Sequence, residues 1–371
     1  MKVTISKDRL LSGLQAVQNV VSSRTTLPVL SNILLNASEG KLTLTATDLD
    51  VTVSCTVPAQ IVTPGTVTLP AKRFFEITRE VPASEIELDS DDKAICSIQA
   101  GSAFFRIHGL PGEDFPQTPT FSQSRAVTVQ QDKLRSMLKK TGFAVSTDES
   151  RYTLNGIFFS LKEHKMILVS TDGRRLALVE EECDVPAECQ ADFIVPSKAI
   201  NELTRLLTMG TVEIKFSENQ AAFTATPATE EGGLASVLIT KLVDGNFPNY
   251  RQVIPQQCQE RVPVAREELL KALRLAEIMT TDKSNSVKLA FTRNQLAITA
   301  NAPEVGETRQ TIAINYKGKD VAIAFNPGFL MDPLKALDND QVYLELTDEL
   351  SPGVVKVDDP FLYVIMPMRL S

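Results

Sequence analysis

The feature that most constrains the fold is a pattern that occurs three times along the chain. VTISKDRLLSGL begins at Val3, VTVQQDKLRSML at Val127 and VPVAREELLKAL at Val262. Each copy alternates like a short strand, continues with charged residues and ends in leucines at helical spacing. Self-similarity on this scale is typical of repeated structural units. The sequence therefore predicts three domains of one design.

A second repeated element supports the same division. A strand meets a proline near the start of a short amphipathic helix, where the missing N–H is tolerated, in TLPAKRFFEI (68–77), IVPSKAINEL (194–203) and, more loosely, AFNPGFLMDPL (324–334). The turns LPGEDFP (110–116) and LVDGNFP (242–248) close the first two units, and the third has no such turn. We expect domains at 1–125, 126–258 and 259–371, each with two helices.

Alternating segments between the helices predict antiparallel hairpins at 42–55, 158–182 and 287–300. Asp-Gly and Arg-Asn-Gln stand where two of these hairpins turn, as tight turns require. Helices laid on antiparallel sheets give an α+β fold class.

Bulk properties set the broad class of protein. The chain has 371 residues, 43% of them hydrophobic and 23% charged, which is ordinary for a globular protein. No stretch approaches the ~18 apolar residues of a membrane helix, and the charged start MKVTISKDRLLSGL is unlike a signal peptide. The five cysteines form no CxxC pair. We expect reduced thiols and a cytoplasmic protein that does not interact with membranes.

Residues for catalysis are sparse. The two histidines, His108 and His164, have no metal-ligand spacing around them, and no phosphate-binding or nucleophile motif is present. Asp48 and Asp172 invite an acid–base reading, but they occupy equivalent places in two repeats, so we interpret both as turn residues. The acidic run at 89–92 is interpreted as a hairpin tip. We expect neither enzymatic activity nor a metal or other cofactor.

Charge is divided unevenly along the chain. The six predicted helices are together net positive, whereas the whole chain has a net charge of −8. One interpretation is that exposed helix faces favour Lys and Arg for solubility. The other is a molecule with one face for phosphates and another that repels them.

The sequence resembles the bacterial sliding clamps, the beta subunits of DNA polymerase III, along its whole length and in the right order. The segments that carry the resemblance are MKVTISKDRLL, TLPVLSNILL (26–35), TATDLD, LPAKRFF, YTLNGIFF (152–159), STDGRRLALV, KLVDGNFPNYR (241–251) and YVIMPMRL. The resemblance implies a processivity factor with the DNA clamp fold, a head-to-tail homodimer closed into a ring, and sheets that join across domain boundaries. It also implies a topological, sequence-independent hold on double-stranded DNA.

The same resemblance assigns DNA contacts and the dimer interface. The DNA-contact candidates are Arg24, Arg73, Arg151, Tyr152 and Lys198. At the dimer interface, the resemblance pairs two first-domain residues with two third-domain residues of the partner protomer: Phe105 and Ile107 with Ile278 and Met279.

Clamps of this family also bind short peptides from the replicative polymerase, the clamp loader, other polymerases and repair proteins. Carried over position by position, the pocket residues are Leu154, Thr171, Gly173, Arg175, Leu176, Pro248, Val253, Asn326, Val364, Met366, Pro367, Met368 and Arg369. Flexible, polarizable methionines suit a surface that accepts several partners. Arg174, Gln252 and Ser284 depart from the pattern of some relatives.

Two rival hypotheses remain open on the sequence. One is an enzyme that uses Asp48 and Asp172. The other is a monomeric interaction scaffold that never encircles DNA, which a solution mass near one chain's 40.7 kDa would favour.

Overall fold

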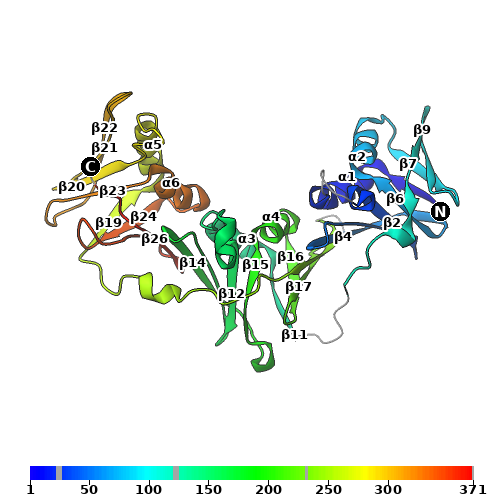
Figure 1. Ribbon diagram of the computed structural model, residues 1–371, viewed down its shortest axis with the longest axis horizontal. Helices are drawn as coiled ribbons and strands as arrows, with labels where there is room; N and C mark the ends of the chain where they lie inside the picture. Colours follow the sequence, from blue (N-terminus) through cyan, green and yellow to red (C-terminus); the bar gives the residue numbers. More distant parts are fainter. Residues whose placement is uncertain (22–26, 120–124, 230–232, 370–371) are drawn as a thin grey trace. The chain divides into compact units, whose positions relative to one another are not determined.

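A computed structural model of the chain describes residues 1–21, 27–119, 125–229 and 233–369 (Figure 1). Two compact units are present: unit 1 comprises Met1–Arg135, Pro186–Cys189 and Lys198–Val243, and unit 2 comprises Ser136–Val185, Gln190–Ser197 and Asp244–Ser371. The middle of the chain contributes to both units. The domain boundaries at 125 and 258 therefore stay a prediction.

The six predicted helices are confirmed within the described residues. They are α1 (Lys7–Val17), α2 (Ala71–Glu80), α3 (Gln131–Gly142), α4 (Ser197–Leu206), α5 (Arg266–Glu277) and α6 (Pro327–Ala336). The repeated leucines are buried, as helical spacing on one face requires: Leu10 and Leu14 in α1, Leu134 and Leu138 in α3, Leu269 and Leu273 in α5. The first helix ends at Val17, and a 3₁₀ turn (Gln18–Val20) follows it.

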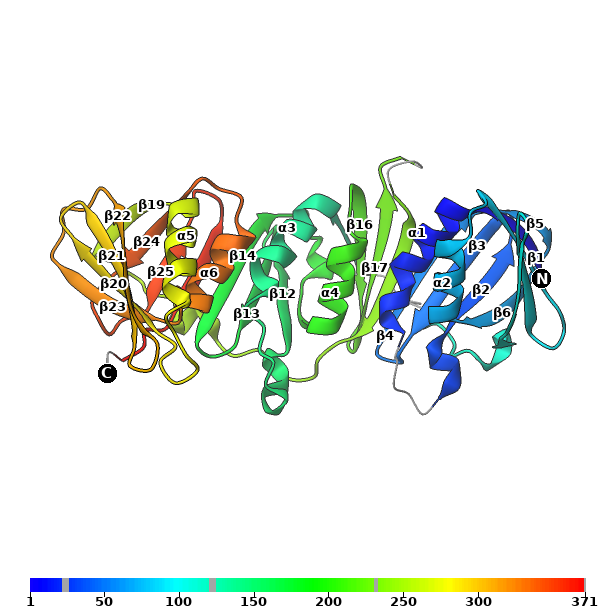
Figure 2. The same cartoon turned by 90° about the horizontal axis from the view of Figure 1, so that it is seen from above.

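Unit 1 contains two antiparallel sheets. Its strands are β1 (Lys2–Ser6), β2 (Asn32–Ser38), β3 (Lys41–Thr47), β4 (Val51–Pro58), β5 (Gln60–Thr63), β6 (Gly65–Pro70), β7 (Glu85–Ser90), β8 (Ile95–Ala100), β9 (Ala103–His108), β10 (Leu110–Pro111), β11 (Arg125–Gln130), β16 (Gly210–Phe216), β17 (Gln220–Pro227) and β18 (Ala235–Lys241). One sheet has the order β5-β1-β7-β8-β9 and the other β10-β6-β2-β3-β4-β18-β17-β16-β11. Figure 2 shows α1 and α2 side by side on this sheet, with α1 packed on β3 and β4 and α2 packed on β6.

The longer sheet of unit 1 connects two repeats. Strand β4 of the first repeat pairs with β18 of the second, with Val53 opposite Leu238. Both residues are fully buried. The expectation that sheets join across the predicted domain boundaries is confirmed here.

Unit 2 also contains two antiparallel sheets. Its strands are β12 (Gly156–Lys162), β13 (Lys165–Thr171), β14 (Arg175–Glu182), β15 (Ala191–Pro196), β19 (Glu260–Ala265), β20 (Val287–Thr292), β21 (Gln295–Ala302), β22 (Gly306–Ala313), β23 (Val321–Phe325), β24 (Gln341–Leu346), β25 (Gly353–Lys356) and β26 (Phe361–Ile365). The orders are β15-β12-β13-β14-β26-β25-β24-β19 and β22-β21-β20-β23. Strand β14 of the second repeat pairs with β26 of the third, with Leu176 opposite Val364.

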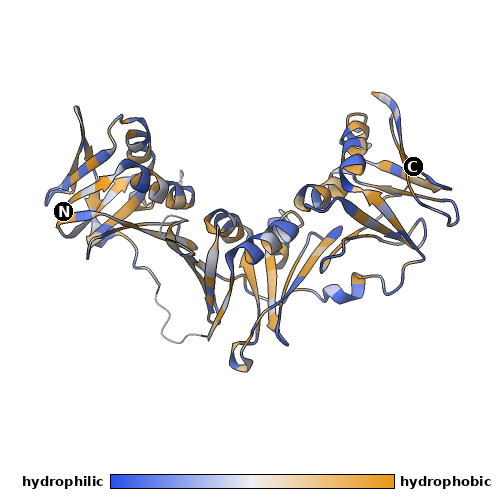
Figure 3. Ribbon diagram, turned by 180° about the vertical axis from the view of Figure 1, so that it is seen from behind, coloured by the Kyte–Doolittle hydropathy of each residue, from blue (hydrophilic) through white to orange (hydrophobic). Residues whose placement is uncertain are grey.

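The hydrophobic cores lie between helices and sheets in each unit. Figure 3 shows apolar residues running along the strands beneath the helices, while polar residues gather in the connecting loops. In unit 2, α5 packs beside α6. A helix–sheet layering of this kind confirms the α+β class.

The predicted hairpins and their turn residues are confirmed. Strands β13 and β14 turn at Asp172-Gly173, and β20 and β21 turn at Arg293-Asn294. Gly173 has φ 84° and Asn294 has φ 58°, the left-handed conformation that these two residue types tolerate.

Candidate docking site and DNA-contact residues

An apolar cluster lies on the sheet that joins the second and third repeats. Its buried members are Val169, Leu176, Val354 and Val364. The segment after Asp244 packs against this cluster through Phe247, whose ring stacks on Phe158 at a centroid distance of 5.0 Å. The Phe of the repeated turn LVDGNFP, Phe247, is therefore the aromatic residue that packs this segment on the sheet.

Beside this cluster, predicted pocket residues leave apolar side chains in solvent. Val253 is 48% exposed, Met366 44% and Met368 39%. Strand β26 ends at Ile365, and two backbone hydrogen bonds fix the residues that follow. The Met366 N–H donates to the Arg174 carbonyl at 2.9 Å, and the Met368 N–H donates to the Ala324 carbonyl at 2.7 Å. The C-terminal segment thus presents its methionines from an ordered backbone.

Arg175 ties the second repeat to the third. Its guanidinium donates to Asp332 at 2.6 Å, to Asp172 at 3.0 Å and to the Phe143 carbonyl at 2.6 Å. It also lies 4.2 Å from the centroid of the Phe329 ring. Burial lowers the pKa of this guanidinium, but the hydrogen bond to Asp332 and the surrounding charges raise it overall. Only 10% of the side chain is exposed. Arg175 therefore supports the site through these buried contacts and offers little surface to a ligand.

Thr171 and Gly173 form the turn beside the cluster. The Thr171 hydroxyl donates to the Arg175 carbonyl at 2.6 Å and accepts the Gly173 N–H at 3.1 Å. A Cβ at Gly173 would lie 2.9 Å from Arg151 Nη1. Close approach and positive φ together favour glycine here.

The remaining pocket candidates have mixed exposure. Leu154 and Val364 are buried, Pro367 is half-buried, and Pro248 and Arg369 are exposed. Asn326 caps α6, since its side-chain oxygen accepts the Phe329 N–H at 3.1 Å. All thirteen candidates belong to unit 2.

The charged DNA-contact candidates within the described residues all have carboxylate partners. Lys198 pairs with Asp48, Arg151 Nε lies 2.9 Å from Asp148, and Arg73 lies 3.6 Å from Glu76. Burial raises the pKa of Asp48, but the hydrogen bonds from Lys198 and from the Val51 and Asp50 N–H groups lower it overall. Tyr152 is 58% exposed, and Arg24 lies outside the described residues.

The dimer-interface candidates expose apolar surface in each unit. Phe105 lies on β9, the outer strand of its sheet, and is 37% exposed. Ile107 on the same strand is half-buried. Ile278 directly follows α5 and is 66% exposed, whereas Met279 is half-buried. An outer strand with exposed aromatic residues is a surface that can pair with another chain.

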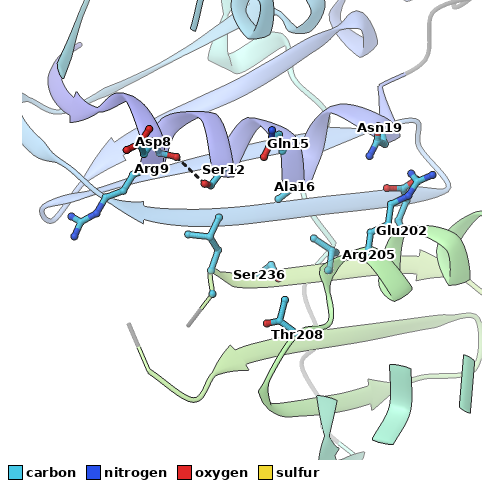
Figure 4. A pocket seen from close by; sticks show the side chains of 13 residues that line it. Asp8, Arg9, Ser12, Gln15, Ala16, Asn19, Glu202, Arg205, Thr208 and Ser236 are labelled. Carbon is cyan, nitrogen blue, oxygen red and sulfur yellow. Dashed lines mark hydrogen bonds and ion pairs between the residues drawn. The ribbon is translucent and has the colours of Figure 1, made fainter. Parts of the chain in front are cut away.

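Unit 1 also contains a cavity of about 590 Å³ between α1 and the region that includes α4 and the start of β18 (Figure 4). Its charged lining residues are Asp8, Arg9, Glu202 and Arg205, and the last two form an ion pair at 2.8 Å. Two cations and two carboxylates give no net charge.

The interpretation of Asp48 and Asp172 as turn residues is confirmed. Asp48 Oδ1 accepts the N–H groups of Asp50 and Val51 at 3.0 and 2.7 Å. Asp172 Oδ1 accepts the equivalent N–H groups of Arg174 and Arg175 at 2.9 and 3.1 Å. Their side chains serve the same turn in two repeats.

The acidic run at 89–92 is only partly the predicted hairpin tip, because Asp89 and Ser90 are the last residues of β7 and pair with β8. The turn to β8 begins at Asp91, whose Oδ1 accepts the Lys93 and Ile95 N–H groups at 3.0 and 2.9 Å. Within the described ranges, no group of three or more His, Cys, Asp or Glu side chains could hold a metal ion. In the same ranges, no helix is long and apolar enough to cross a membrane.

Three repeats of a domain with two helices on antiparallel sheets, joined by sheets that continue from one repeat to the next, define a DNA clamp. Family models agree: the N-terminal, central and C-terminal domains of the DNA polymerase III beta subunit match residues 1–119, 128–249 and 251–369. The chain belongs to the DNA polymerase III beta subunit family, the bacterial sliding clamps.

Individual relatives cover the full chain. The beta sliding clamp of Chlamydia muridarum is 36% identical over 370 residues, covering 100% of this chain and 99% of that protein. The beta sliding clamp of Bacillus subtilis is 30% identical with full coverage of both chains. A DnaN sliding clamp from Bartonella birtlesii, solved bound to griselimycin, superposes with a TM-score of 0.93 at 33% identity and full coverage of both chains.

Membership of this family sets the function. Sliding clamps are processivity factors for DNA polymerase and are not enzymes. The prediction of a non-enzymatic processivity factor is confirmed, and the hypothesis of an enzyme that uses Asp48 and Asp172 is wrong.

Proposed function

We propose that two copies of this chain close head to tail into a ring around double-stranded DNA in the cytoplasm. Phe105 and Ile107 of one protomer pack on Ile278 and Met279 of its partner. A heterologous contact of this kind closes when the repeats complete a circle. The exposed aromatic residues of β9 and the exposed Ile278 support the assignment, because both surfaces offer apolar area to a partner.

The ring holds DNA by topology and needs no base contacts. Arg24, Arg73, Arg151, Tyr152 and Lys198 are the residues that we assign to the DNA backbone. A weak attraction to phosphate that ignores sequence lets the ring slide, whereas many tight contacts would hold it in place.

The apolar surface in unit 2 docks short peptides from the replicative polymerase, the clamp loader, other polymerases and repair proteins. The observation that carries this proposal is the exposed set Val253, Met366 and Met368 beside a buried apolar cluster. One Leu or Phe anchor seated there supplies most of the binding free energy. Such an interface is exchangeable, as a surface that serves several partners must be.

The test is Met368→Ala, measured by titrating a fluorescent peptide that carries a Leu-Phe clamp motif. The exposed part of Met368 is buried on binding, which is worth about 1 kcal/mol and predicts a roughly fivefold loss of affinity. Met209→Ala is the matched control, because Met209 is 69% exposed in unit 1 and lies outside the assigned pocket. Unchanged affinity in folded, dimeric Met368→Ala would place the docking site elsewhere.

A second ligand provides an independent readout. Because the Bartonella birtlesii clamp was solved with griselimycin, we expect griselimycin to bind this chain and to displace the fluorescent peptide. Simultaneous binding of both would contradict a shared site.

A further inference from the structure

Two of the assigned DNA-contact cations are held by carboxylates whose own positions are fixed by the backbone. Asp48 Oδ1 accepts two turn N–H groups, and its Oδ2 accepts the hydrogen bond from Lys198 Nζ. Asp148 Oδ1 accepts the Ser150 N–H at 3.0 Å, and its Oδ2 accepts from Arg151 Nε at 2.9 Å. In both cases one oxygen anchors the carboxylate and the other faces the cation.

A third cation, Arg73, also has a carboxylate neighbour, but this neighbour is placed by a helix and not by a turn. Arg73 and Glu76 lie one turn apart on α2, with 3.6 Å between Nη1 and Oε2. Arg73 is 78% exposed, so the cation is free to meet a ligand while its partner stays beside it. Neighbours three residues apart on a helix face the same way, which keeps this carboxylate close to the cation.

We propose that Asp48, Glu76 and Asp148 are positioning residues that limit the attraction of the ring for DNA and so set how fast it slides. The proposal rests on the assignment of Lys198, Arg73 and Arg151 to the DNA backbone.

The physical basis is competition for the same cations. A phosphate that approaches one of them must compete with a carboxylate already in place, so each contact is weaker than that of an unpaired cation. Fewer counterions are then released per phosphate, and the hold on DNA depends less on salt. Weak contacts do not release a closed ring, because the ring stays on DNA by encircling it. They do let it slide faster.

The expected change in the salt dependence of DNA binding follows from the number of cation–carboxylate pairs. Three pairs in each of two protomers give six cations, and each cation that fully engages a phosphate adds about 0.9 to the slope of log affinity against log salt. Removing the carboxylate charges should therefore steepen the salt dependence by up to about 5. By the same counterion argument, we expect the dwell time of the test variant on linear DNA at low salt to lengthen by roughly tenfold or more.

The experiment loads the clamp on circular DNA, cuts the circle once, and follows the dwell time before the ring slides off, across a range of KCl concentrations. The test variant is Asp48→Asn, Glu76→Gln, Asp148→Asn. Asparagine keeps the Oδ1 acceptor that holds each turn, so the fold is retained while the charge is lost. Glu76→Gln alone is a second variant that cannot disturb either turn, because Glu76 lies on α2 and is half-buried there. It should lengthen the dwell less than the triple variant does.

Two further variants separate the possible outcomes. The control Glu85→Gln, Glu87→Gln, Glu113→Gln removes the same charge from exposed carboxylates that form no ion pair with the described residues. The cation variant Lys198→Gln, Arg73→Gln, Arg151→Gln tests the DNA contacts themselves. We expect a longer, more salt-sensitive dwell for the test variant, a shorter dwell for the cation variant and no change for the control.

The contrary results are distinct. If the cation variant shortens the dwell but the test variant behaves like the control, the DNA contacts are right and the proposed role of the carboxylates is wrong. If neither variant differs from the control, the assignment of the DNA contacts fails, and this proposal fails with it.

Discussion

Replacing Arg175 with methionine should loosen the join between the second and third repeats. The change removes the guanidinium that donates to Asp332 and Asp172, at 2.6 and 3.0 Å, and to the Phe143 carbonyl at 2.6 Å. Methionine retains much of the apolar stem over Phe329. The main effect is therefore the loss of charge and hydrogen bonds in a site where only 10% of the arginine side chain is exposed.

The expected loss of stability in Arg175→Met depends on how deeply Asp172 and Asp332 are buried. Removing one partner of a buried ion pair costs about 3–5 kcal/mol, because the other charge stays desolvated and unpaired. Asp172 is 15% exposed and Asp332 29%, so water can partly solvate them. We therefore expect the lower end, about 3 kcal/mol, confined to unit 2.

Hydrogen exchange followed by mass spectrometry measures this loss of stability segment by segment. A cost of about 3 kcal/mol corresponds to roughly a hundredfold faster exchange in α6 and in the turn at 172–174, provided that opening of this site limits exchange there. Peptides from α1 and α2 in unit 1 serve as the internal reference and should not change.

A double variant checks the cause. Arg175→Met with Asp332→Leu removes both partners. It should exchange more slowly than Arg175→Met alone, because no carboxylate is left at position 332 with only the more distant Lys335, at 3.8 Å, as its cation. Exchange in α6 that is the same in Arg175→Met and in the unchanged protein would refute a stabilising role for this network.

Two further predictions concern ring closure and thiol reactivity. Ile278→Ala with Met279→Ala should give a folded monomer, because truncating buried apolar side chains at an interface costs about 2–5 kcal/mol each; a dimer that persists at nanomolar concentration by sedimentation would show that the interface lies elsewhere. Among the five cysteines, Cys258 should react first with iodoacetamide at pH 8, because it is half-buried and the others are buried. Burial raises the pKa of the Cys258 thiol, and it raises the pKa of Cys55 to about 12. Equal labelling of Cys55 in peptide mass spectra would contradict this.

Local pattern was sufficient to predict the repeated parts of the fold. Leucine spacing located the helices, and alternation with turn residues located the hairpins. The repeat itself identified Asp48 and Asp172 as turn residues, because an equivalent position in two domains has an equivalent structural task. Each of these inferences depends on residues that are close in sequence.

Pairings between distant residues were beyond the reach of local pattern. Arg175 meets Asp332, Lys198 meets Asp48, and the two members of each pair lie more than one hundred residues apart. Helical periodicity and turn propensity carry no information about which distant side chain completes a contact. The docking and DNA-contact residues therefore came from resemblance to sliding clamps, and the carboxylate partners of the cations emerged only from the structure.

The stacking of Phe247 on Phe158 was only partly predictable from the sequence. The repeated Phe-Pro turn signalled that Phe247 mattered, but it did not say what the ring would touch. The aromatic anchor of the segment that contains Pro248 and Val253 was thus present as a motif before its contact was known.

The central claim is that this chain holds DNA by encircling it, and one measurement tests that claim most directly. Clamp is loaded on closed circular DNA, half of the sample is cut once with a restriction enzyme, and the DNA-bound fraction is followed by gel filtration at low and high salt. We predict retention on the circles at both salt concentrations and rapid loss from the cut molecules. Equal loss from circles and cut DNA as salt rises would mean ordinary electrostatic binding and would contradict encirclement.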